Sequence, residues 1–249
     1  MLQKTSDAFT GINDADILHN SGMINLNMLG LCHKRGIRRL FFSSSACVYP
    51  EYNQSNNHIL NCSEDSVYPA APDSDYGWEK LFSERMYMAF HRNKGMEVRI
   101  ARYHNIFGPL GSWNDGREKA PATLCRKIAS TADNGEIEIW GDGNQIRSFL
   151  RIDECIEGTL RLMRSGWTGP VNLGSDEQVS INQPADMVMA IAGKNMRKIH
   201  IQGPEGVRAR NSDNRLIYQK LGWRPSQPLI RGLEKTYAWI NGQLNTINR

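Results

Sequence analysis

The sequence lacks the features that mark several special classes of protein. Its five cysteines, in 249 residues, form no CxxC pair and have no histidine at metal-ligand spacing, which disfavours a disulfide framework and a metal site. No run of 18 or more apolar residues occurs, and the first residues show no secretory leader. We therefore expect a soluble, cytoplasmic protein of a reducing compartment, with neither a metal nor a membrane span.

The charge pattern gives only a weak indication of partners. The formal net charge is +4, and the basic residues are scattered along the chain, which argues against nucleic-acid binding and slightly favours small anionic ligands. A merely soluble surface would explain the charge equally well. The length allows one large domain, or a large domain with a small lobe.

Helical and strand patterns alternate along the chain. Helical spacing of apolar residues over 20–35 is followed by a β-rich run at 37–45, by a helix over 73–94 that ends at Gly95, and by a strand at 96–103. Further on, helices are predicted at 120–132, from Asp153, from about Ile181 and at 229–240, with strands at 136–140 and 170–174. This order predicts an α/β fold with a parallel, Rossmann-like sheet and a ligand crevice at the carboxyl ends of its strands.

Three side chains near two of these strand ends could carry chemistry. Tyr76 and Lys80 are four residues apart at a predicted helix start, so they share a face. A neighbouring cation favours phenolate and should lower the pKa of Tyr76 from ~10. Such a pair alone is more often an ordinary helix-surface pair, but Ser45 ends the preceding strand and could bond to the same substrate oxygen. The polar connection at 50–75 is long enough to suggest a functional loop.

Four stretches carry a family resemblance: "SSSACVY", "PDSDYGWEK", "RYHNIFGP" and "WGDGNQIRSFLRIDE". Together they span residues 43–154, and the chain resembles the extended short-chain dehydrogenase/reductase family of nucleotide-sugar epimerases and dehydratases. The resemblance implies bound NAD, contacted by Tyr76 and Lys80, with Ser45, Tyr76 and Lys80 as the hydride-transfer centre. It also implies a partial NAD-binding domain at 1–110 and, at 111–249, mainly a nucleotide-sugar-binding lobe with segments that return to the sheet.

Position 47 distinguishes the reactions of that family. Its dehydratases carry an acidic pair after the strand-end Ser or Thr and its 4-epimerases carry Thr, whereas this chain has Ala46 and Cys47. A thiol there can carry a proton. A small buried hydrophobe is the usual role of a cysteine, but the place beside the redox centre favours a chemical role.

A second pair of stretches, "GREKAPATLCRK" and "GPEGVRARNSDN", is similar to family members that invert C3 and C5 of GDP-mannose, over residues 20–242. This similarity implies Cys47 and Lys119 as the acid/base pair, GDP-L-galactose as product, a homodimer, and a place in ascorbate biosynthesis. The substrate-holding positions that it implies are Ser45, Asn105, Glu118, Lys127, Gln145, Arg147 and Arg208. A guanidinium such as that of Arg208 suits a diphosphate.

Other interpretations stay open. Lys119 and Lys127 could be solvated helix lysines, and the two arginines could form surface ion pairs. The chain could be a catalytically silent nucleotide-sugar-binding paralogue, or a 4-epimerase or dehydratase of another nucleotide sugar, although Cys47 and Lys119 argue against the latter. None of the 22 glycines forms the GxGxxG fingerprint of dinucleotide binding. We therefore expect a truncated gene model, a fragment or a shortened paralogue, inactive without its glycine loop.

Overall fold

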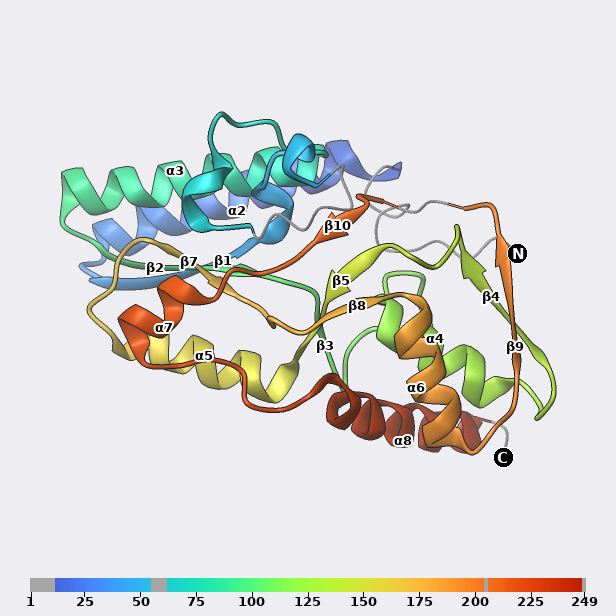
Figure 1. Ribbon diagram of the computed structural model, residues 1–249. Coiled ribbons are helices and arrows are strands. Elements are labelled where there is room, and N and C mark those ends of the chain that lie inside the picture. Colours follow the sequence, from blue (N-terminus) through green and yellow to red (C-terminus); the bar gives the residue numbers. More distant parts are fainter. Residues whose placement is uncertain (1–11, 55–61, 204–205, 248–249) are drawn as a thin grey trace.

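The computed structural model describes residues 12–54, 62–203 and 206–247, so residues 55–61 of the predicted long connection lie outside the description. Three parallel strands form its central sheet in the order β1-β2-β7: β1 (Arg39–Ser45), β2 (Glu97–Tyr103) and β7 (Pro170–Leu173). Each neighbour is reached through helices (Figure 1), as parallel pairing requires. The predicted α/β fold with a parallel sheet is confirmed.

Helices cover both faces of this sheet (Figure 1). One face carries α2 (Asp14–Lys34) and α3 (Asp75–Lys94), and the other carries α5 (Ile152–Arg164) and α7 (Arg215–Leu221). Local signals set the ends of α3: the hydroxyl of Ser74 accepts a hydrogen bond from the backbone N–H of Gly77, and Gly95 takes the left-handed conformation at φ 67°. Since β1 and β2 end side by side, with Ser45 opposite Tyr103, α3 begins beside the carboxyl edge of the sheet.

A second group of elements lies beyond this edge. Its strands are β3 (Ile106–Phe107), β4 (Glu136–Trp140), β5 (Ile146–Ser148), β6 (Leu150–Arg151), β8 (Gln178–Ser180), β9 (Arg197–Ile201) and β10 (Ala209–Arg210), and its helices are α4 (Ala120–Ser130), α6 (Asn182–Ala192) and α8 (Leu229–Ile247). The three helices enclose a core of their own (Figure 1). β5 lies between β10 and β8, and β4 pairs with β9. Because β7 returns to the first sheet, the chain crosses between the two groups more than once.

A buried polar network fixes the strands to α3. Both side-chain oxygens of Glu84 accept hydrogen bonds from the guanidinium of Arg102, at 2.9 and 2.7 Å, and Glu84 also accepts one from the hydroxyl of Ser44 at 2.5 Å. Arg102 further donates to the hydroxyl of Tyr49, which donates to the side-chain oxygen of Asn172 at 2.6 Å. The charged pair is 3 and 4% exposed. This network therefore holds the segment just before Ser45 in place.

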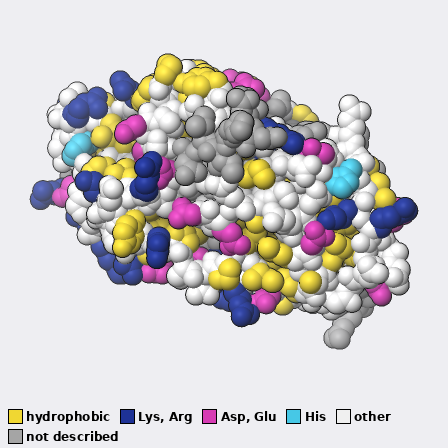
Figure 2. All heavy atoms as spheres, in the orientation of Figure 1, with side chains coloured by type: hydrophobic (Ala, Val, Ile, Leu, Met, Phe, Trp, Pro, Cys, Tyr) yellow, Lys and Arg dark blue, Asp and Glu magenta, His cyan; other side chains and the backbone are white. Residues whose placement is uncertain are grey.

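Apolar side chains remain exposed on α2. They are Leu18, Met23, Ile24, Leu26, Met28 and Leu31. Trp78 and Phe82, on the neighbouring α3, are 46 and 55% exposed. No helix in the described ranges is both long and apolar enough to cross a membrane. Figure 2 shows hydrophobic side chains on the surface in view, interspersed with charged ones. Exposed apolar side chains on two packed helices are typical of an interaction surface.

Candidate active site

A large cavity of about 1380 Å³ opens at the carboxyl edge of the sheet and is lined by both groups of elements. All eleven site residues predicted from the sequence line it: Ser45, Cys47, Tyr76, Lys80, Asn105, Glu118, Lys119, Lys127, Gln145, Arg147 and Arg208. They come from segments up to 163 positions apart, so the fold brings together what the sequence separates. The roles of the individual residues stay predictions.

The turn after β1 presents Cys47. Ser45 ends the strand, and its hydroxyl accepts a hydrogen bond at 3.2 Å from the backbone N–H of Cys47, which caps a 3-10 turn over Ala46–Val48. The start of α3 packs directly on this turn: a Cβ at Gly77 would lie well inside van der Waals contact of the Cys47 carbonyl oxygen and 2.9 Å from Cβ of Pro72. Only a glycine permits this approach of α3.

Replacing Gly77 with alanine should therefore lower the free energy of unfolding by ~1–3 kcal/mol, the usual cost of an overpacked site. Urea denaturation followed by circular dichroism would measure it. The control is Gly242→Ala, in α8, where an added Cβ would meet nothing within 4 Å. That control should be stabilised by up to ~1 kcal/mol, because alanine favours helix. An equal change in the free energy of unfolding in the two variants would contradict the close packing of α3 on the turn.

Tyr76 and Lys80 meet at the same edge, but the expected effect of Lys80 on the phenol is wrong for this structure. The pKa of Tyr76 is raised to about 12: burial is the largest cause, the neighbouring Cys47 acts in the same direction, and a hydrogen bond with Ser45 opposes them. Lys80 donates to the Ser43 carbonyl at 3.1 Å, and its Nζ lies 5.5 Å from the centre of the Tyr76 ring. Burial lowers the pKa of Lys80. Desolvation of the phenolate thus affects the pKa of Tyr76 more than the attraction to Lys80 that the four-residue spacing suggested.

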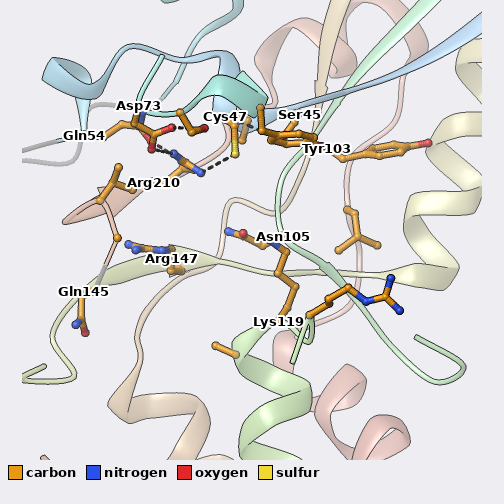
Figure 3. A pocket seen from close by; sticks show the side chains of 18 of the residues that line it. Ser45, Cys47, Gln54, Asp73, Tyr103, Asn105, Lys119, Gln145, Arg147 and Arg210 are labelled. Carbon is orange, nitrogen blue, oxygen red and sulfur yellow. Dashed lines mark hydrogen bonds and ion pairs between the residues drawn. The ribbon is translucent and has the colours of Figure 1, made fainter. Parts of the chain in front are cut away.

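The opposite wall of the cavity carries Lys119, which precedes the first residue of α4. In Figure 3, Cys47 and Lys119 approach the cavity from opposite sides. Glu118 is 5% exposed, and one of its carboxylate oxygens accepts a hydrogen bond from Arg126 at 2.8 Å. The other oxygen is buried and has no hydrogen-bond partner. A buried acceptor of this kind suits a donor from a ligand, such as a sugar hydroxyl.

Polar residues from β5, β10 and the loops around them line a third side. Asn105, at φ 44°, donates to the Ser148 carbonyl at 3.0 Å, and Gln145 donates to the Trp140 carbonyl at 3.2 Å. Arg208 donates to both carboxylate oxygens of Asp142 at 3.0 Å, which holds the pKa of that carboxyl well below its usual range.

Two further cations line the cavity. Arg147 donates to the Ile146 carbonyl at 2.9 Å. Lys127 donates to the Glu138 carbonyl at 2.9 Å, and burial lowers its pKa. Together with Arg208 they make three cationic side chains in the lining of the cavity, which would attract an anionic ligand.

The sequence interpretation missed Arg210. Its guanidinium contacts Cys47, Asp73 and Gln54, all of which line the cavity (Figure 3). A signal for it exists in the Arg-x-Arg order of residues 208–210, because side chains two apart in an extended segment point the same way. The partners themselves carry no signal, since they lie 137–163 positions away along the chain.

Comparison with known proteins assigns the chain to a family. The sequence profile of the NAD dependent epimerase/dehydratase family matches residues 5–174. The chain belongs to this family. GDP-mannose 3,5-epimerase of Arabidopsis thaliana is 48% identical over 95% of this chain, and the match spans 62% of that protein. The chain thus covers less than two thirds of the length of this curated member of the epimerase family.

Solved structures of the epimerase family share the fold. UDP-glucose 4-epimerase from Thermotoga maritima aligns over 94% of this chain and 74% of its own with a TM-score of 0.83 at 23% identity. UDP-glucuronic acid 4-epimerase from Bacillus cereus, in complex with UDP-glucuronic acid and NAD, aligns over 90% of this chain and 68% of its own with a TM-score of 0.76 at 27% identity. The predicted Rossmann-like architecture is therefore confirmed.

The family is NAD dependent, and the described residues fit part of that cofactor. A hydroxyl, a phenol and an ammonium group, from Ser45, Tyr76 and Lys80, line one wall of the cavity at the carboxyl end of β1, which is where a parallel sheet binds its ligand. These donors suit the nicotinamide ribose. Within residues 12–54, 62–203 and 206–247, no glycine-rich strand-to-helix turn is present that would hold the pyrophosphate.

Proposed function

We propose that this chain carries the acid/base and sugar-binding part of an epimerase that converts GDP-mannose into GDP-L-galactose by inversion at C5 and C3. The observation that carries the proposal is the approach of Cys47 and Lys119 to one cavity from opposite sides (Figure 3). The 48% identity to GDP-mannose 3,5-epimerase of Arabidopsis thaliana supports it. Inversion of a carbon needs a proton removed on one face and another delivered on the other, which two groups on opposite walls can do.

The chemistry explains why a single site serves two carbons. NAD, when bound, supplies reversible hydride transfer at C4, so that C4 becomes a ketone and is later reduced again. C3 and C5 are the two carbons next to that ketone, and their protons are acidified by it. One member of the Cys47–Lys119 pair takes the proton as the C–H bond breaks, and its electron pair moves into the enolate. The other member then forms the new C–H bond from the opposite face.

Tyr76 and Ser45 are assigned to the C4 oxygen. Tyr76 removes the proton of the C4 hydroxyl, and Ser45 forms a hydrogen bond with the same oxygen. The burial that raises the pKa of Tyr76 to about 12 must be offset before phenolate forms. Lys80, with its Nζ 5.5 Å from the centre of the Tyr76 ring, is the cation proposed to favour phenolate, but desolvation outweighs it in this structure.

The remaining predicted residues are assigned to substrate binding. Glu118, with its unpartnered carboxylate oxygen, and Asn105 are proposed to bond to the sugar, and Lys127 and Gln145 to position the nucleotide. Arg147 and Arg208 are proposed to bind the diphosphate bidentately. We propose the same division of the chain as the sequence suggests, with the cofactor side at 1–110 and mainly the sugar lobe at 111–249.

Replacing Arg208 with alanine should weaken the binding of GDP by ~1.5–3 kcal/mol, the scale of a hydrogen bond to a charged group. Isothermal titration calorimetry with GDP alone measures it without requiring turnover. Asp142→Asn is the matched comparison, because it removes the carboxylate that now holds the Arg208 guanidinium and should leave GDP binding equal or tighter. Unchanged GDP affinity in Arg208→Ala would place this arginine outside the binding site.

Incubation with NAD and GDP-mannose in deuterated water tests the proposed function. Chromatography identifies the product, and mass spectrometry counts the deuterium taken up. GDP-L-galactose carrying deuterium at C3 and C5 supports the proposal. A product inverted at C4 without deuterium would indicate a 4-epimerase, and loss of water from the sugar a dehydratase. Binding of GDP-mannose with neither product nor deuterium would indicate a silent nucleotide-sugar-binding protein.

We further propose that two copies of the chain associate through α2 and α3, whose exposed apolar residues include Trp78 and Phe82. Pairing of these faces would remove apolar surface from water. Light scattering of the wild type and of Phe82→Glu would show whether a dimer forms and depends on this face. A cytoplasmic location and a place in ascorbate biosynthesis belong to the same proposal.

A further inference from the structure

Arg210 binds three segments that meet beside Cys47. Its Nη1 lies 3.4 Å from Sγ of Cys47, its Nη2 donates to a carboxylate oxygen of Asp73 at 2.8 Å, and its Nε donates to the side-chain oxygen of Gln54. Figure 3 shows the guanidinium between these groups, directed at the sulfur. The Arg210 side chain is 11% exposed. A partly buried arginine from the distant strand β10 therefore contacts the thiol.

The guanidinium is held in one orientation. Gln54 is fully buried, and its amide nitrogen donates to the carbonyls of Tyr49 at 2.9 Å and Pro50 at 3.1 Å, so its side-chain oxygen is fixed toward Arg210. Asp73 engages the far nitrogen. Because the guanidinium is planar with donors in fixed directions, these two contacts leave Nη1 aimed at the sulfur.

We propose that Arg210 is the positioning residue of Cys47: it holds the sulfur toward the cavity and stabilises negative charge on it. Arg210 itself keeps its protons, because a guanidinium is not deprotonated in proteins, so the proton taken up in the reaction resides on sulfur. The importance of this for turnover rests on the proposed function, but the Arg210–Cys47 contact does not. Asp73 lies on the far side of the guanidinium and partly neutralises its charge, while Tyr76 and Lys80 also face the thiol.

Alkylation by iodoacetamide tests the contact without sugar or cofactor. Thiolate, and not thiol, attacks the reagent: sulfur forms a bond to the carbon that carries iodine, and iodide leaves. Cys47 is half-buried and lines the cavity, while Cys32, Cys62, Cys125 and Cys155 are buried. The folded protein is therefore alkylated at fixed pH, and mass spectrometry of the peptide that contains Cys47 gives the alkylation rate of this thiol. In Arg210→Gln this rate should fall by about tenfold or more, because an opposite charge beside the sulfur is lost.

Three further variants separate charge, orientation and nonspecific effects. Arg210→Lys keeps the charge without the fork and should give a rate between wild type and Arg210→Gln. Asp73→Asn removes the opposing carboxylate and should give a rate equal to or above that of wild type. Arg161→Gln makes the same change in a surface pair with Glu157 and should leave the rate unchanged.

Equal alkylation of wild type and Arg210→Gln, with the fold intact by circular dichroism, overturns the proposal. If Arg210→Gln does not fold, the decision rests on Arg210→Lys and Asp73→Asn, and a Cys47 rate in Asp73→Asn well below that of wild type would then contradict the charge argument. Failure of the proposed function would be seen separately. In that case alkylation would follow these predictions while GDP-mannose gave no deuterated product.

Discussion

Replacing Cys47 with alanine should slow the uptake of solvent deuterium at C3 and C5 of GDP-mannose by ~10²–10⁴-fold, the range for a positioned acid/base group. The variant keeps Ser45, Tyr76 and Lys80, so reversible oxidation at C4 should still occur in protein that binds NAD. It lacks the only thiol on the cavity wall among the described residues. Mass spectrometry of the recovered GDP-sugar measures deuterium uptake, and loss of hydride label from C4 measures oxidation separately.

The control for Cys47→Ala is a thiol outside the cavity. Cys32 is a buried residue of α2, so Cys32→Ala should lose some stability but keep the parental uptake of deuterium per folded molecule. Lys119→Ala should resemble Cys47→Ala, with kcat falling more than KM rises. If Cys47→Ala takes up deuterium at the parental rate, the thiol only fills space and the acid/base assignment is wrong.

The elements that sequence patterns predicted are those with strong local signals. α3 begins after Ser74 and ends before Gly95, and both boundaries come from local capping chemistry. The short strands of the second group, such as β5, β8 and β10, went unpredicted. They contain two or three residues each, and pairing with partners distant in sequence defines them, so no local period could indicate them.

The features of the site likewise divide into those that could be predicted from the sequence and those that could not. The positions assembled around the cavity could be predicted because the family resemblance supplied long-range information that single motifs do not. The pKa of Tyr76 could not, since burial is the largest influence on it and burial depends on the whole fold. Arg210 went unnoticed because its contacts with Gln54 and Asp73 arise only when β10 lies beside the turn after β1.

Replacing Arg102 with methionine should lower the free energy of unfolding by ~3–5 kcal/mol, the usual effect of breaking a buried ion pair. The variant leaves the carboxylate of Glu84, 4% exposed, without its cation. It also removes the donor that Arg102 provides to the Glu64 carbonyl at 2.9 Å. Urea denaturation measures the loss, and Arg161→Gln, which breaks an exposed pair on α5, should cost ~0.5 kcal/mol or less.

The double variant Arg102→Met/Glu84→Leu tests the cause of this loss. If the uncompensated carboxylate is responsible, removing it should make the double variant more stable than Arg102→Met alone, although Ser44 then loses its acceptor. A double variant no more stable than the single one would assign the loss to the hydrogen bonds of Arg102 with Tyr49 and Glu64. If Arg102→Met lowers the free energy of unfolding no more than Arg161→Gln does, burial does not make the Arg102–Glu84 pair more important for stability than an exposed pair. The segment before Ser45 would then be held by strand pairing with β2 alone.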